Sequence, residues 1–390
     1  MDYSKILAGK AKQIKPSGIR KFFDLAGTME GCISLGVGEP DFKTPWMVRD
    51  AGIKSLERGK TWYTSNAGLA EMRREGANYL ARRFDLHYDP ETEMLVTVGG
   101  SEAIDLALRA VLEPGDEVII PEPCYVSYAP LTQLVGGVAV PVPLKAENGF
   151  RLTAQELRDK ITPRTKIVVL PFPCNPTGAV MRERHLAEIA KVLQDTDILV
   201  LTDEIYAELT YGPRRHVSIA SMPGMKERTV YINGFSKAYA MTGWRLGYVC
   251  APQPLMQVMT KIHQYAIMCA PTTSQYAGIV ALRDGDEAIE SMRDEYDMRR
   301  KYLTSNLNRM GLTCFEPEGA FYVFPSIQKS GLSSEEFCEK LLMSKKVAVV
   351  PGTAFGASGE GFVRISYSYS VAHLSEALGR IEEFLKELSQ

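Results

Sequence analysis

A lysine at position 237 follows a short apolar run, Thr229 to Ile232, and stands among small residues in the stretch Gly234-Phe235-Ser236-Lys237-Ala238. A desolvated lysine amine can form a Schiff base with an aldehyde. Arg245, shortly after it, offers a planar guanidinium suited to a phosphate. Most single lysines are solvated and do no chemistry, so the neighbouring motifs must decide whether this one does.

Three other apolar runs also end in polar residues. Asn175-Pro176-Thr177-Gly178 follows Lys166–Leu170, and Thr202-Asp203-Glu204-Ile205-Tyr206 follows Ile198–Leu201. Gly99-Gly100-Ser101-Glu102 comes shortly after Met94–Thr97. Open α/β sheets bind ligands at the carboxyl ends of their strands. Together with Lys237, these segments therefore predict one shared site.

In this order, the four segments resemble those of the fold-type I pyridoxal-phosphate aminotransferases. The resemblance is to the class I/II family, which includes aspartate and aromatic aminotransferases, and it runs from about Gly18 to the C-terminus. It implies a pyridoxal 5'-phosphate cofactor and a homodimer with shared active sites.

Apolar strand-like runs alternate with helical patterns from about Trp46 to about Asp284. We expect helices over Ser101–Leu112 and Arg184–Gln194, among others. The expected strands are Met94–Val98, Glu117–Ile120, Val138–Val142, Lys166–Leu170, Ile198–Thr202, Thr229–Ile232 and Leu246–Cys250. This alternation favours βαβ units and a largely parallel sheet covered on both faces. It predicts an α/β large domain over residues 46–285, with a mostly parallel seven-stranded sheet flanked by helices.

The pattern changes after Asp284. A charged helical stretch, Glu287–Met310, leads to short strand-like pieces, and an amphipathic helix over His373–Leu388 closes the chain. The strand-like pieces are Gly319–Pro325, Val347–Val350 and Gly361–Ser366. This mixture predicts a smaller α+β domain, residues 286–390 joined by residues 1–45, that can close on the site.

Pyridoxal phosphate needs a lysine for its aldehyde, an acid at its ring nitrogen, a phosphate cup and a flat partner for its ring. The resemblance assigns the covalent bond and the proton shuttle to Lys237, and the acid to Asp203. Tyr206 and Asn175 are expected to hydrogen-bond the ring hydroxyl oxygen. Tyr125 is expected to stack on the ring.

The phosphate cup is expected where a helix starts after Gly99, because free N–H groups and the helix dipole favour an anion there. The resemblance also implies that Tyr63 reaches the phosphate from the neighbouring subunit. The remaining phosphate-binding residues are expected to be Gly100, Ser101, Glu102, Ser236 and Arg245.

Substrate recognition is expected to fall to Arg364, in the apolar stretch Phe362-Val363-Arg364-Ile365. A buried arginine is costly unless paired, and an α-carboxylate is a natural bidentate partner. An intraprotein ion pair would explain this residue alone equally well. By resemblance, Gly38 and Asn175 also contact the substrate.

Two departures from the family pattern and one further resemblance bear on the amino donor or on the phosphate. Some aspartate-specific members of this branch carry a lysine where this chain has Ser101, so aromatic, other neutral or N-acylated donors stay open beside aspartate. Many relatives carry a hydroxyl where this chain has Gly234, so one phosphate hydrogen bond is missing or moves to Ser236. Ser17–Phe22 and Met241–Arg245 resemble bacterial aminotransferases that act on acetylated diaminopimelate.

Composition narrows the class of protein. The 390 residues are 45% hydrophobic with a formal net charge of -2, which gives no electrostatic case for nucleic acid or an anionic membrane surface. No run resembles a signal peptide or a membrane span. Seven scattered cysteines without a Cys-x-x-Cys pair fit reduced thiols in the cytoplasm, and the five dispersed histidines show no metal-ligand spacing. We expect small-molecule substrates and no metal.

The leading hypothesis is transamination between an L-amino acid, such as aspartate or an aromatic or related donor, and a 2-oxo acid such as 2-oxoglutarate. A carbon–sulfur β-lyase on the same scaffold is the alternative. A regulatory module that binds the cofactor is disfavoured, because almost nothing precedes the resemblance. A nicotinamide dehydrogenase is disfavoured as well, since no Gly-x-Gly-x-x-Gly follows a strand.

Overall fold

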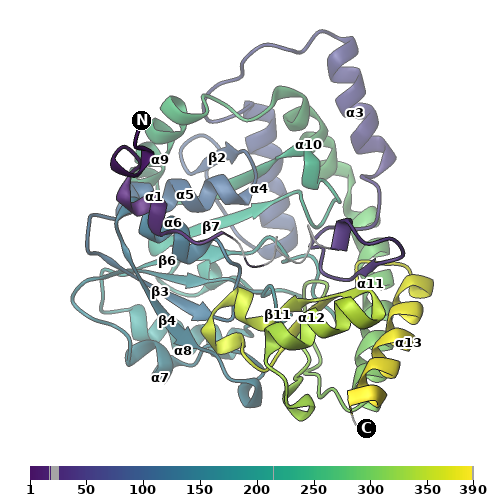
Figure 1. Ribbon diagram of the computed structural model, residues 1–390. Helices are drawn as coiled ribbons and strands as arrows, with labels where there is room; N and C mark the ends of the chain where they lie inside the picture. Colours follow the sequence, from purple (N-terminus) through teal and green to yellow (C-terminus); the bar gives the residue numbers. More distant parts are fainter. Residues whose placement is uncertain (17, 19–25, 214, 389–390) are drawn as a thin grey trace.

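A seven-stranded sheet forms the centre of the molecule (Figure 1). The computed structural model describes residues 1–16, 18, 26–213 and 215–388. The strands of this sheet are β2 (Met94–Thr97), β3 (Glu117–Glu122), β4 (Val138–Pro143), β5 (Thr165–Leu170), β6 (Leu199–Asp203), β7 (Thr229–Gly234) and β8 (Gly247–Cys250). Their order is β2-β8-β7-β6-β5-β3-β4, and β8 runs in the direction opposite to that of the other six strands. The predicted mostly parallel sheet is confirmed.

The sequence of each strand explains its place in the sheet. Continuous β-branched and aliphatic runs, such as Val118–Ile120 and Ile167–Leu170, are buried on both faces, as strands covered by helices must be. β4 differs because it contains Pro141 and Pro143 and is half-exposed. Proline cannot donate to a ladder, and β4 pairs only with β3 at the edge of the sheet.

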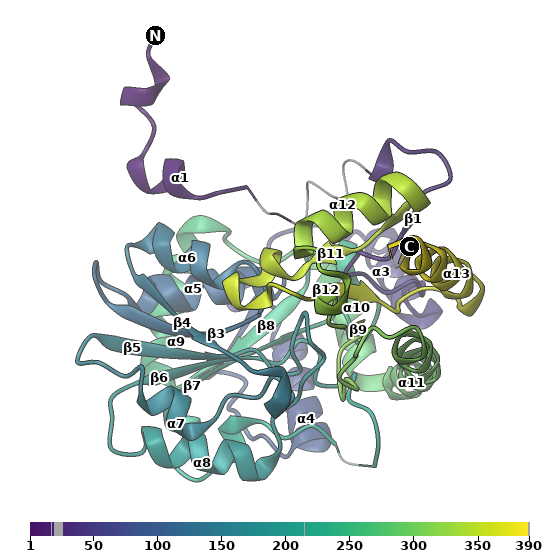
Figure 2. The ribbon, with the colours of Figure 1, turned by 60° about the horizontal axis from the view of Figure 1, so that its bottom comes forward.

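Helices cover both faces of this sheet. Figure 2 shows α5 and α6 on one side of it and α7 and α8 on the other. The helices of this part are α3 (Trp46–Glu57), α4 (Ala70–Phe84), α5 (Gly100–Val111), α6 (Tyr128–Val135), α7 (Ala154–Arg158), α8 (Glu183–Leu193), α9 (Gln253–Ala266) and α10 (Thr272–Asp284). The helices predicted over Ser101–Leu112 and Arg184–Gln194 are α5 and α8, each shifted by one residue.

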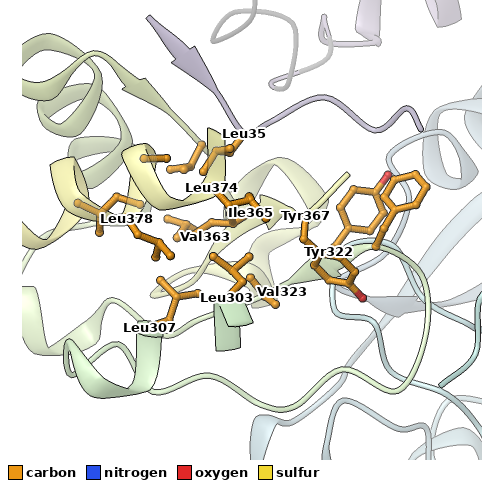
Figure 3. Close-up of a cluster of buried hydrophobic side chains, with 14 of the residues drawn as sticks. Leu35, Leu303, Leu307, Tyr322, Val323, Val363, Ile365, Tyr367, Leu374 and Leu378 are labelled. Atoms are coloured by element: carbon orange, nitrogen blue, oxygen red, sulfur yellow. The ribbon is translucent and has the colours of Figure 1, made fainter. Parts of the chain in front are cut away.

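A second group of elements packs beside the sheet around its own apolar cluster (Figure 3). Its helices are α11 (Asp286–Arg309), α12 (Ser334–Lys345) and α13 (Val371–Leu388). Its strands are β1 (Ile33–Ser34), β9 (Tyr322–Val323), β10 (Val347–Ala348), β11 (Val350–Pro351) and β12 (Val363–Ser366). They form a three-stranded antiparallel sheet, β11-β12-β9, and a parallel pair, β1-β10. The short α1 (Gly9–Gln13) lies near the N-terminus.

The strand predicted over Gly319–Pro325 is much shorter than expected. The backbone N–H groups of Gly319 and Ala320 donate to Gly178 and Leu209 instead of a strand partner, at 2.9 and 2.8 Å. Only Tyr322 and Val323 pair with β12. This segment is therefore tied to the turn after β5, and that turn carries Asn175.

The apolar cluster of the second group also takes in Tyr206, Leu209 and Ala240, which follow β6 and β7. The cluster thus reaches across to the carboxyl ends of the central strands. The division into residues 46–285 and residues 1–45 with 286–390 stays a prediction.

Short 3₁₀ helices connect several elements. They are Tyr3–Lys5, Ala146–Asn148, Ile219–Ser221, Lys226–Arg228, Thr242–Trp244, Gln328–Ser330, Gly352–Phe355 and Ala357–Gly359. Within the described residues, no helix combines the length and apolar character that crossing a membrane requires. Apart from Gly18, the Ser17–Phe22 segment lies outside the described residues.

Candidate active site

A cavity of about 660 Å³ opens where β5, β6 and β7 end. Its wall combines side chains from these strand ends with side chains from β9 and β12 of the second group. The sequence-predicted residues that line it are Gly38, Gly100, Ser101, Tyr125, Asn175, Asp203, Tyr206, Ser236, Lys237, Arg245 and Arg364. The fold thus gathers at one place most of the residues that the motifs singled out.

The amine of Lys237 lies inside this cavity. Its Nζ donates a 2.6 Å hydrogen bond to the carbonyl of Gly38 and lies 5.8 Å from the ring centroids of both Tyr206 and Phe321. Burial lowers the pKa of Lys237 to about 8, against the opposing attraction of Glu39. Such a pKa leaves roughly a tenth of the amine neutral at pH 7, far more than for an ordinary lysine, and a nucleophilic amine must be neutral.

Asp203 closes the end of β6 and is only 8% exposed. Its Oδ2 accepts a 2.7 Å hydrogen bond from the Tyr128 hydroxyl, and its Oδ1 accepts a 3.3 Å bond from the Ile205 N–H. Burial raises the pKa of Asp203, while these two donors work in the opposite direction. Tyr128 belongs to the segment in which sequence reasoning assigned only Tyr125.

Tyr206 is buried, and its hydroxyl lies 2.8 Å from the hydroxyl of Tyr322. Burial raises the pKa of Tyr206 well above its ordinary value, so the phenol is neutral at physiological pH. Sequence reasoning missed Tyr322, because a tyrosine in a short apolar strand carries no motif.

Arg364 lies on β12 and is 2% exposed. One guanidinium nitrogen donates to Asn175 Oδ1 at 2.8 Å, and a second donates to the carbonyl of Gly36. Its Nε is buried without a hydrogen-bond partner among the described residues. The two partners are neutral, so no carboxylate in the described chain compensates the charge through these bonds. A bound anion would supply that compensation.

The loop before α5 is shaped by close backbone contact. Gly99 has φ of 78°, and a Cβ there would lie 2.8 Å from the Arg245 guanidinium. A Cβ on Gly247 would lie 2.7 Å from the Gly99 carbonyl carbon. Two glycines therefore let strand, loop and guanidinium meet at the N-terminus of α5, where free N–H groups favour an anion.

Glu102 lies on this first turn, but its side chain is not part of the cavity wall. Its Oε2 accepts a 2.5 Å bond from the Val98 N–H, and its Oε1 lies 2.6 Å from Nδ1 of the fully buried His263. The carboxylate therefore holds the loop, and any contact of Glu102 with a phosphate would have to come from its backbone N–H. No sequence signal pointed to His263 on α9.

Two further expectations have a structural outcome. Tyr63 is 75% exposed and does not line the cavity within this chain, so its expected contact with a phosphate stays a prediction. A Cβ on Gly234 would lie 3.0 Å from Gly247 Cα and 3.1 Å from Leu246 O. A side chain at position 234 would therefore require β8 to shift by a few tenths of an ångström.

Comparisons with known proteins decide the family. The model of the family "Aminotransferase class I and II" matches residues 30–381. This chain is a class I/II aminotransferase. The chain is 48% identical to an aspartate aminotransferase of Pyrococcus abyssi, over 96% of this chain and 97% of the relative. It is 45% identical to aromatic-amino-acid aminotransferase 2 of Thermococcus litoralis, over 98% of both chains.

A solved structure gives the same result. The aspartate aminotransferase of Thermus thermophilus, solved with maleate, superposes with a TM-score of 0.92 at 36% identity, over 97% of this chain and 99% of that one. The protein is therefore a pyridoxal-phosphate-dependent transaminase of fold type I.

The cavity of the aminotransferase fits its cofactor. The buried amine of Lys237 suits an aldehyde, and the glycine-lined start of α5 beside Arg245 suits a phosphate. The carboxylate of Asp203, at the end of a neighbouring strand, suits a protonated ring nitrogen.

Proposed function

We propose that this aminotransferase moves the α-amino group of an L-amino acid, with an aspartate-like, aromatic or related side chain, to a 2-oxo acid such as 2-oxoglutarate. The names of the relatives support these two donor classes. The observation that carries the proposal is the arrangement of one cavity. It holds a buried amine at Lys237, a buried carboxylate at Asp203 and a buried guanidinium at Arg364 that has no carboxylate partner among the described residues.

Pyridoxal phosphate, when bound, supplies an aldehyde for the amino group and an electron-withdrawing ring. In our proposal the Lys237 amine would hold the cofactor through that aldehyde, and it would carry a proton to and from the substrate α-carbon. Its lowered pKa supports both duties, since a base works best with a pKa near the working pH. Asp203 would hold the proton on the ring nitrogen, and Tyr125, which also lines the cavity, would pack against the ring.

Arg364 anchors the α-carboxylate in this proposal. Two of its nitrogens are oriented by Asn175 and the Gly36 carbonyl. Asn175 thereby faces both the substrate and the cofactor, because its amide nitrogen is left to donate to the ring hydroxyl oxygen together with Tyr206. Gly38, whose carbonyl accepts from Lys237, keeps the backbone close to the reacting centre.

The phosphate is held in our proposal by the backbone of Gly100, Ser101 and Glu102, the hydroxyl of Ser236 and the guanidinium of Arg245. Ser236 and Arg245 both line the cavity. The free N–H groups at the start of α5 and a fixed positive charge together favour a dianion.

We also propose a cytoplasmic homodimer in which Tyr63 completes the neighbour's phosphate site. Trp62, next to Tyr63 in the chain, is also a large exposed side chain, and this supports burial of this segment against a neighbour. Mixed dimers test the shared site. Tyr63→Ala and Lys237→Ala chains, each inactive alone, should form hybrids with one intact site and regain roughly a quarter of the wild-type activity. Hybrids that regain no activity would show that Tyr63 does not complete the site of the neighbouring subunit.

The domain division is proposed too, with residues 1–45 and 286–390 closing over residues 46–285. The cavity supports it, because Arg364 and Tyr322 face Lys237 and Asp203 from the second group of elements. X-ray scattering should report a smaller radius of gyration when maleate is added to the enzyme, and an unchanged radius would argue against closure.

One panel tests the donor class. Purified enzyme with 2-oxoglutarate should form glutamate from aspartate or from aromatic amino acids, and the ranking of kcat/KM identifies the preferred donor. Release of pyruvate and thiol from cystathionine without any oxo acid would instead support the β-lyase alternative. Activity with neither substrate set would refute the proposed donor range.

A further inference from the structure

Tyr322 contacts three parts of the site at once. It lies on β9 and is 1% exposed, and Figure 3 shows it at the edge of the apolar cluster, away from the leucines of α11 and α13. Its ring faces Arg364, its hydroxyl faces Tyr206, and the same hydroxyl lies against the backbone of Gly38.

The ring contact fixes the guanidinium of Arg364. The Cζ of Arg364 lies 4.4 Å from the ring centroid of Tyr322 and 4.8 Å from that of Phe355. The guanidinium is thus in contact with two aromatic rings, and its charge is removed from water. Cation–π attraction counts for more at such a desolvated site than at an exposed one.

The hydroxyl contact bears on the proton of Tyr206. The two phenol oxygens are 2.8 Å apart, and either can donate. If the Tyr206 hydroxyl donates its hydrogen bond to the ring hydroxyl oxygen of the cofactor, the hydrogen bond between the two phenols must be donated by Tyr322. A chain of donors strengthens each bond in it. Tyr322 would then make Tyr206 the stronger donor.

Gly38 makes room for this arrangement. A Cβ at position 38 would lie 2.6 Å from the Tyr322 hydroxyl oxygen. The absence of a side chain at Gly38 therefore serves the position of Tyr322 as well as the approach of backbone to the Lys237 amine.

We propose that Tyr322 is a positioning residue that links the arginine for the substrate carboxylate to the tyrosine for the cofactor hydroxyl. Its ring face holds Arg364 in the plane that receives the carboxylate, and its hydroxyl donates to Tyr206. This inference rests on the roles proposed above for Arg364 and Tyr206.

Two substitutions separate the ring from the hydroxyl. Tyr322→Phe keeps the ring, so the dissociation constant of maleate should stay within about twofold of wild type. The same variant loses the donor to Tyr206, so the pKa of the bound cofactor's absorbance transition should rise by about half a unit. Tyr322→Leu loses both features, and maleate should bind about five- to thirtyfold more weakly as well.

Tyr296→Phe is the matched control. Tyr296 is a fully buried tyrosine of the same apolar cluster, and its hydroxyl has no hydrogen-bond partner among the described residues. This variant should leave both readouts at their wild-type values. A change as large as that in the Tyr322 variants would mean that any buried tyrosine of this cluster has the same effect, and would overturn the inference.

Arg364→Lys and Tyr206→Phe distinguish failure of the inference from failure of the proposed function. If Arg364→Lys binds maleate as well as wild type, or Tyr206→Phe leaves the absorbance pKa unchanged, the underlying role is wrong. If both variants respond but Tyr322→Leu binds maleate normally, or Tyr322→Phe shows no rise in pKa, Tyr322 is structural only.

Discussion

The Tyr128 hydroxyl donates a 2.7 Å hydrogen bond to Asp203 Oδ2, inside a wall where the carboxylate is almost fully buried. Burial raises the pKa of Asp203, and this bond counteracts the rise. Tyr128 therefore favours the ionised form of Asp203, which the role that we propose for Asp203 at the ring nitrogen requires.

Tyr128→Phe should move the acid limb of the kcat/KM profile upward by about one pH unit, since a hydrogen bond to a charged group and one pKa unit have similar free energies. The sign follows from the linkage. Without the donor, the folded-state pKa of Asp203 rises, so activity is lost at a higher pH on acidification. A pH–rate profile checks this.

Asp203→Asn should bind the cofactor yet lose activity about a hundredfold or more at every pH.

The buried lysine should make stability depend on pH in the cofactor-free protein. The folded-state pKa of Lys237 is about 8, below its ordinary value of 10.5, so the native state releases this proton first. The free energy of unfolding should therefore rise with pH between about 8 and 10.5. Urea titrations across that window should show the rise in wild type and a smaller one in Lys237→Met. Parallel curves for the two proteins would contradict the lowered pKa.

Gly99→Ala should weaken cofactor binding about tenfold, because a Cβ there would collide with the Arg245 guanidinium. Gly115→Ala is the control. Gly115 also has a positive φ, but a Cβ there would meet open space. Both variants bear the backbone strain of alanine at positive φ. Fluorescence titration with pyridoxal phosphate should therefore show a loss only for Gly99→Ala, and equal losses would remove the collision as the cause.

Arg364→Lys should lower kcat/KM about a hundredfold for aspartate and phenylalanine alike, because lysine keeps the charge but loses the fixed fork. The group that Arg364 is proposed to bind, the α-carboxylate, is the same in both donors. The steady-state constants for the two donors provide the measurement. A loss confined to one donor would move the anchor of the α-carboxylate elsewhere.

The strands and the strand-end residues could be predicted because short stretches of sequence show both the apolar runs and the polar residues that follow them. Ile167–Leu170 in β5 is an uninterrupted apolar run, and Asp203 stands at the end of the next strand, β6. The direction of side chains could not be predicted in this way. The Glu102 carboxylate contacts the Val98 N–H and His263. His263 lies on α9, far along the chain, and no spacing in the sequence indicates its contact with Glu102.

Tyr128 and Tyr322 show the same limit. Each has a partner fixed only when distant strands pack, Asp203 for the first and Tyr206 for the second. The shortened β9 has a related cause, since Gly319 and Ala320 bond to loops that sequence patterns place nowhere near them.

Ser101 is exposed at the mouth of the cavity on the first turn of α5, whereas Arg364 is sealed between aromatic rings. Solvent-facing positions tolerate replacement with little loss of stability. Laboratory evolution toward new amino donors can therefore vary the Ser101 side chain with little loss of stability, while Arg364, the proposed carboxylate anchor, stays in place.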